Sequence, residues 1–221
     1  SATDITDATV QAWADGLAEE TDPRARYTVV SLIAKTGVSP ERRAAARPGL
    51  QALAKSPPTT PDVLRARVLL AEYARADHDR APLAENVQSL LALGVLPCTA
   101  ERSMYESVMH AAQHASKYYL RYGLHDAAIR MHEALAAKFP DTLLAGEELT
   151  RAQAIRADGV GETLELLRKE VASPLSRRED DRVQAIYREV VEHTPNPAVR
   201  AAVAALLEKT PGVGTHSGAT K

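Results

Sequence analysis

The segment YGLHDAAIRMHEALAAKFPD (residues 122–141) decides the fold, because it combines a turn, a helix and a helix stop. Gly123 permits a tight turn, and Ala128 is small enough for the helix after the turn to lie close to the helix before it. Pro140 ends that helix, because proline has no backbone N–H to continue the hydrogen-bond ladder. The segment therefore predicts a helical hairpin that turns at Gly123.

Helix starts are clear along the rest of the chain. An N-cap residue followed by proline at the first helical position occurs at Asp22-Pro23, Ser39-Pro40, Thr60-Pro61 and Asn196-Pro197. The segment SRRE (176–179) adds a capping box. With the apolar spacing, these signals predict helices at 6–20, 24–36, 41–55, 61–77, 82–93, 100–122, 124–138, 142–157, 161–172, 177–193 and 197–209.

Short connections separate these helices, which predicts that neighbouring helices run antiparallel. We expect Pro48-Gly49 to break or kink the helix at 41–55. The helix at 61–77 has the clearest apolar stripe, formed by Val63, Leu64, Val68, Leu70, Ala71 and Ala74. Strand-forming residues are sparse and no run alternates cleanly. The sequence thus predicts an all-α stack of about eleven antiparallel helices.

The 221 residues are 45% hydrophobic but only 4% aromatic, so a sizeable core of alanine, leucine and valine is expected. We expect one helical-repeat domain at 1–209, with a possible sub-boundary near 55–61. Residues 210–221 are small and polar and cannot bury enough apolar area to order themselves, so we expect an extended tail that a partner surface holds. No apolar run approaches the length of a transmembrane helix, so no membrane-spanning segment is expected.

Charge is balanced along the chain. The formal net charge is −2; residues 1–100 carry 11 Lys/Arg against 12 Asp/Glu, and residues 101–221 carry 16 against 17. This balance argues against a protein that holds nucleic acid mainly by neutralising phosphates. The 20 arginines outnumber the 7 lysines, which favours forked ion pairs with neighbouring helices or with a partner.

The stretch at 119–140 resembles a tetratricopeptide repeat. Tyr119, Gly123, Ala128 and Pro140 have that family's spacing for its tyrosine, turn glycine, small residue and terminal proline, and Pro174 follows Pro140 after 34 residues, the family's period. The resemblance implies a right-handed α-solenoid that binds proteins.

A second stretch, at 90–112, resembles the junction of two pentatricopeptide repeats through Gly94, Pro97 and Tyr105. Gly37 and Pro40 repeat the turn, although the two turns are 57 residues apart, which is not a multiple of that family's period. This resemblance implies RNA binding and an organelle such as the mitochondrion. The segment 196–209 is similar to one helix of a HEAT-type repeat. Together these features favour a degenerate α-solenoid, with an irregular helical bundle as the alternative.

Three histidines form a candidate metal site. His110 and His114 lie one turn apart on one helix, and His132 is level with His114 if the two helices pair antiparallel about Gly123. Three histidines can hold zinc. However, Ala111 stands where the metalloprotease motif has glutamate, and no carboxylate lies nearby in the sequence to orient the rings. Packing or surface histidines are therefore the preferred interpretation.

Two tyrosines are candidate partner-binding residues. Tyr118 and Tyr122 are one turn apart and can share a face, where tyrosine rings with polar tips suit an interface. Packing within the hairpin is the alternative. Cys98 is expected to be an inert thiol, and the acidic residues at 179–181 are expected to be a solvated helix start.

These observations predict a non-enzymatic scaffold, without a cofactor, that binds other protein subunits of a large assembly. The resemblance implies that this assembly is mitochondrial. The alternative is an RNA-binding pentatricopeptide-like protein. A metal protein built on His110, His114 and His132 is a third hypothesis.

Overall fold

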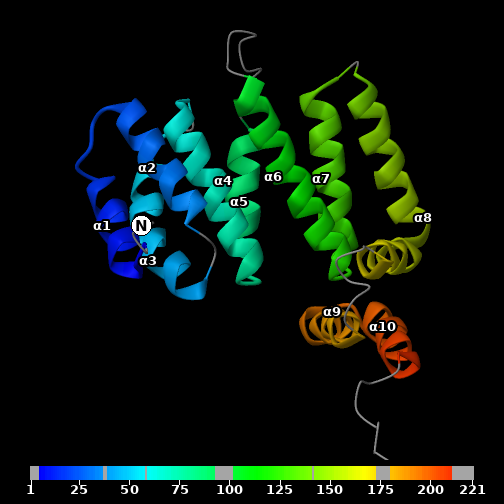
Figure 1. The fold of residues 1–221 in the computed structure, drawn as a ribbon. Coiled ribbons are helices and arrows are strands. Elements are labelled where there is room, and N and C mark those ends of the chain that lie inside the picture. Colours follow the sequence, from blue (N-terminus) through cyan, green and yellow to red (C-terminus); the bar gives the residue numbers. More distant parts are fainter. Residues whose placement is uncertain are drawn as a thin grey trace, which may run out of the picture. The chain divides into compact units, whose positions relative to one another are not determined.

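The computed structural model describes residues 5–36, 39–57, 59–92, 102–140, 142–172 and 180–210. These ranges contain ten helices and no strand, which confirms the predicted all-α class (Figure 1). The chain divides into two compact units, Ser1–Ala115 and Ser116–Lys221. The division falls within α6 (Arg102–Arg121), and the segment 55–61 lies inside the first unit.

The first unit holds α1 (Asp7–Gly16), α2 (Pro23–Lys35), α3 (Pro40–Ala54), α4 (Pro61–Ala76), α5 (Arg80–Leu91) and the first part of α6. The predicted caps at Asp22 and Ser39 are confirmed, because their side chains accept hydrogen bonds from backbone N–H groups of the first turn. Thr60 precedes Pro61 as predicted, but its side chain makes no such bond.

Helix α4 is the central element of this unit. One cluster of buried side chains packs Val63, Leu69 and Tyr73 of α4 against residues of α1, α2 and α3. A second cluster packs Leu64 and Val68 of α4 against α5 and α6. Every residue of the predicted stripe is buried, but burial extends beyond the stripe to both sides of the helix. A helix that is apolar around most of its circumference must be covered by neighbours on more than one side.

Helix α3 continues through Pro48-Gly49, so of the predicted break or kink at this pair the break does not occur. Gly49 faces α1 at very close range: a Cβ atom built on it would lie 2.0 Å from the carbonyl oxygen of Ala14. Ala46 and Leu50, on either side of the pair, are fully buried. Packing against α1 therefore stabilises helical geometry where local preference alone would interrupt it.

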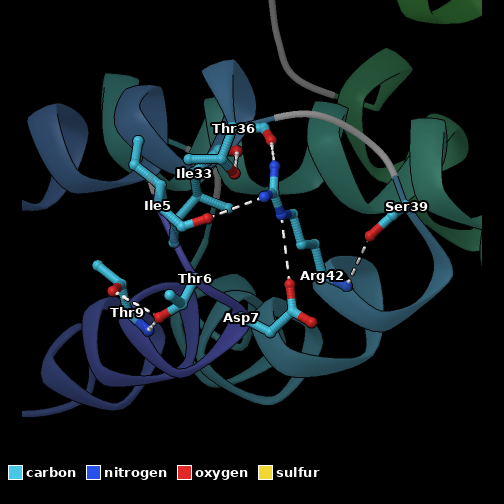
Figure 2. A network of polar contacts seen from close by, with 8 residues as sticks. All are labelled: Ile5, Thr6, Asp7, Thr9, Ile33, Thr36, Ser39 and Arg42. Carbon is cyan, nitrogen blue, oxygen red and sulfur yellow. Dashed lines mark hydrogen bonds and ion pairs between the residues drawn. The ribbon is translucent and has the colours of Figure 1, made fainter. Parts of the chain in front are cut away.

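Arg42, in the first turn of α3, connects three segments of the first unit (Figure 2). Its guanidinium donates to the backbone carbonyl groups of Ile5 and Thr36 and to the Asp7 carboxylate, 3.3 Å from Nε. The carbonyl of Thr36 is one of the groups that the end of α2 leaves without a helical partner. Arg42 thus holds the chain before α1 and the end of α2 against the start of α3.

The second unit holds the end of α6 with α7 (His125–Lys138), α8 (Leu143–Ala172), α9 (Asp180–His193) and α10 (Pro197–Lys209). Helix α7 packs against α8, and α10 packs against both α8 and α9. Gly123 has φ +68°, which confirms the predicted glycine turn, and Ala128 is fully buried against its neighbours.

The predicted helices at 142–157 and 161–172 are joined without a loop. Helix α8 runs from Leu143 to Ala172 and leaves helical geometry only at Asp158 (φ −152°, ψ 77°), where it changes direction (Figure 1). The Asp158 carboxylate accepts a hydrogen bond from the Gly161 N–H at 2.8 Å, as an N-cap does. This merger accounts for ten helices where eleven were predicted.

Several predictions fall outside the described residues. These are the capping box at 176–179, the turn residues Gly37, Gly94 and Pro97, Cys98, Pro174 and the tail beyond residue 210.

Candidate functional site

His132 of α7 is at the centre of a buried polar cluster in the second unit. Its Nε2 atom lies 2.7 Å from the Oγ of Ser116 on α6, and its Nδ1 atom bonds to the carboxylate of Glu148 on α8. The exposed fractions are 1% for Ser116, 6% for His132 and 0% for Glu148. Three helices are thus connected by one chain of side-chain hydrogen bonds, which we call the Ser–His–Glu cluster.

Arg151 supplies a positive charge next to the buried Glu148 carboxylate of this cluster. Its Nη1 donates to Glu148 Oε1 at 2.6 Å, one turn along the same helix, while Oε2 faces His132. A fully buried carboxylate is costly unless hydrogen bonds and an opposite charge compensate for lost hydration. The guanidinium is half exposed, so it joins the buried carboxylate to the solvent-facing side of α8.

The connectivity of this cluster matches the order in which a serine nucleophile, a histidine base and an orienting carboxylate are arranged in hydrolases. Its surroundings do not suit that chemistry. A nucleophilic serine must reach a substrate carbonyl beside groups that bind the developing oxyanion, whereas the Ser116 hydroxyl is buried between helices. As placed, the cluster fixes the relative positions of α6, α7 and α8.

The three candidate metal-ligating histidines have different surroundings. His110 and His114 are exposed on α6, with ring centroids 6.3 Å apart and nearly parallel planes. His132 is buried, with both ring nitrogens engaged by Ser116 and Glu148. No group of three histidine, cysteine or acidic residues that could hold a metal ion is present in the part of the chain that the structure describes.

The sequence near these histidines suggested no orienting carboxylate, and the structure supplies one to His132 from a distant part of the sequence. Glu148 orients its ring from another helix, 16 residues later in the sequence. A signal was present: Glu148 shares a helical face with Ala145, Ala152 and Ile155, which are all buried. A charged residue within an apolar stripe predicts a buried partner, but it does not identify that partner.

The candidate partner-binding residues Tyr118 and Tyr122 are buried in the second unit, with ring centroids 4.8 Å apart. The Tyr122 hydroxyl donates to the Glu189 carboxylate of α9. Burial, reinforced by this bond, raises the pKa of Tyr122 above its ordinary value. In this arrangement the two rings pack between helices and present little surface to a partner.

An ion-pair network lies beside Tyr122. Arg121 contacts Glu170 of α8 and Glu189 of α9, each at 3.0 Å. Burial raises the pKa of Glu170 above its ordinary value, and the nearby Arg121 cation only partly offsets that effect. One guanidinium therefore holds two carboxylates and links the end of α6 to two other helices.

The turn between α9 and α10 packs on the turn between α6 and α7. The Thr194 hydroxyl donates to the Tyr122 carbonyl at 2.7 Å, and the Asn196 side chain donates to the Gly123 carbonyl at 3.2 Å. Asn196 also accepts from Ala198 N and Val199 N, which confirms it as the predicted N-cap of α10. These side chains satisfy carbonyls that the end of α6 leaves without helical partners.

The first unit has an open groove of about 400 Å³ formed by α3, α4 and α5, which we call the α3–α5 groove. Its polar lining consists of Arg47, Gln51, Lys55, Arg67, Glu85 and Asn86. Ala54, Leu70 and Pro82 supply its apolar part. Sequence reasoning did not find this groove, because its lining comes from three separate helices.

No helix among the described segments is long and apolar enough to cross a membrane. Comparison with protein-family models, with curated proteins and with solved structures found no match to this chain.

Proposed function

We propose that the chain is a non-enzymatic, α-solenoid-like scaffold that binds other protein subunits of a larger assembly. The observation that carries the proposal is a contrast between two places. The Ser–His–Glu cluster has the order of residues found in hydrolases, but all three of its side chains are buried between α6, α7 and α8. The α3–α5 groove, in contrast, is open to solvent, and its lining of charged, amide and apolar side chains suits the binding of a partner.

Helical packing of this kind suits a scaffold physically. Short hairpins present long, rigid surfaces, and a rigid surface loses little conformational entropy when a partner binds. The side chains that hold the hairpins together lie between the helices, so the outward faces are left for recognition. The tetratricopeptide resemblance supports the same proposal. The pentatricopeptide resemblance supports the RNA-binding alternative, and it makes a mitochondrial assembly the first to examine.

Crosslinking mass spectrometry with the chain as bait in its native extract tests this function. We expect crosslinks from Lys55 and Lys209 to a fixed set of protein subunits. A monodisperse monomer that crosslinks only within itself would contradict the scaffold. Copurification of RNA in place of protein would favour the nucleic-acid alternative.

A further inference from the structure

We propose that the α3–α5 groove binds an acidic peptide segment of a protein partner. This inference rests on the proposed scaffold function and specifies the chemistry of the partner. Its basis is the imbalance of charge in the groove lining, together with its open shape and mixed polar and apolar surface.

The lining carries a surplus of positive charge. Arg47, Lys55 and Arg67 are cationic and Glu85 is the single acid, so the formal sum is 3 − 1 = +2. Asp77 contacts Arg47, but the same carboxylate also binds Arg43, so one negative charge is shared by two guanidinium groups. A chain with a formal net charge of −2 thus concentrates positive charge at this place.

Arg67 contributes a cation that no acid of the described segments neutralises. Its Nη2 donates to the carbonyl groups of Ala54 and Ser56 at the end of α3, and its buried Nε atom has no hydrogen-bond partner. Within the described residues no carboxylate pairs with Arg67 or with Lys55, which is exposed at the C-cap of α3. Neutral carbonyls satisfy donors but leave the positive charge, so a carboxylate from a ligand would gain attraction at both residues.

The remaining lining favours a peptide over a small free acid or a nucleic acid. Pro82 is partly exposed beside the cations, whereas Ala54 and Leu70 are largely buried, so the groove offers a small apolar surface to a segment where acidic and apolar side chains alternate. The exposed amide of Gln51 can bond to a peptide backbone, whereas the buried Asn86 amide donates to the Pro82 carbonyl at 2.8 Å. Glu85 within the lining, and the negative net charge of the chain, oppose a dense polyanion such as RNA.

Fluorescence anisotropy with the full chain tests the assignment. The probe is a short fluorescein-labelled peptide that alternates glutamate with leucine, and the control peptide has glutamine in place of glutamate. We expect salt-sensitive binding of the glutamate peptide only. Lys55→Glu should weaken it about fivefold, and Glu85→Lys should tighten it about fivefold, as expected for one charge reversal at a groove edge.

Two variants control for net charge. Arg24→Glu and Glu19→Lys change the charge of the chain by the same amounts as the groove variants, at exposed positions of the first unit outside the groove. Both should bind the peptide as the unmodified chain does. Equal effects of groove and control variants, or no binding of the glutamate peptide, would overturn the assignment. So would a uridine oligonucleotide that binds the groove more tightly than the peptide.

The two proposals fail in different ways. If the chain crosslinks to fixed protein subunits but the glutamate peptide does not bind, the groove assignment fails and the scaffold function stands. If the peptide binds as expected but no subunit is crosslinked, the scaffold function fails and the groove remains an acidic-peptide site.

Discussion

The Nδ1 atom of His132 and the carboxylate of Glu148 share a hydrogen bond inside the second unit, and both residues are buried. The bond joins α7 to α8, while the Nε2 atom of the same ring extends the connection to Ser116 on α6. A polar cluster of this kind contributes to stability only while every member has a partner, because an unpaired buried polar group is costly.

Removal of the Glu148 carboxylate should therefore destabilise the second unit strongly. We expect Glu148→Ala to lower the free energy of unfolding by about 3 kcal/mol or more, because it leaves the Nδ1 atom of the buried His132 ring without the Glu148 carboxylate. Urea denaturation followed by circular dichroism measures the change. Glu147→Ala is the matched control: this neighbour is 64% exposed and should change stability by less than about 0.5 kcal/mol. Equal effects of the two variants would show that the cluster adds no stability.

The contact of α1 with α3 should not tolerate a side chain at Gly49. Gly49→Ala would place Cβ 2.0 Å from the Ala14 carbonyl oxygen, a backbone atom that cannot rotate away. We expect a loss of about 1–3 kcal/mol, typical of overpacking, in thermal or urea unfolding. Gly16→Ala, at the end of α1 with no atom within 4 Å of the new Cβ, should be neutral or stabilising by up to about 1 kcal/mol. An unchanged Gly49→Ala variant would mean that the two helices are farther apart.

The α9–α10 turn should depend on the Thr194 hydroxyl. Thr194→Val keeps the shape of the side chain but removes the donor to the Tyr122 carbonyl, in a buried position. The loss of stability should be about 1–3 kcal/mol, the cost of an unsatisfied buried acceptor. Amide hydrogen exchange offers a local measurement, since protection at the start of α10 should fall more than protection in α1. Thr28→Val, at an exposed site on α2, is the control and should have little effect.

Glu170 should make stability depend on pH. Its pKa in the folded chain is raised, chiefly by burial, so the folded state holds this proton more tightly than the unfolded state. Its contribution therefore favours folding at a pH below the unfolded pKa, and it is lost as pH rises through the folded pKa. Urea denaturation at a series of pH values from about 4 to 7 should show that Glu170→Gln gains stability relative to the unmodified chain as pH rises. Glu165→Gln, half exposed on the same helix, should show no such gain.

Local signals in the sequence predicted much of the secondary structure. Asp22, Ser39 and Asn196 cap helices as expected, and Gly123 adopts the left-handed conformation that its turn requires. These features succeed because each depends on residues within one turn of the position itself. The proline in α3 shows the limit of such reasoning, since contact with α1 overrides the local preference.

The candidate sites depend on residues that the sequence keeps apart. Glu148 reaches His132 only because α7 packs on α8, and the lining of the α3–α5 groove comes from three helices. Spacing within one helix suggested His110 and His114 as a pair, and the structure does place their rings next to each other. Spacing in the sequence could not show that the His132 ring bonds to Ser116 and Glu148 instead.

The single non-helical residue in α8 has a consequence for how this chain tolerates insertions. Where a loop joins two helices, extra residues can be absorbed without turning either helix. In the arm after Asp158 the helix is continuous, so one residue inserted between Gly161 and Thr163 would rotate the rest of that arm by about 100° relative to its first turn. That rotation would move Thr163 and Leu167, which are buried, out of phase with the surfaces they pack against. Packing therefore constrains the spacing of residues along this arm as well as their identity.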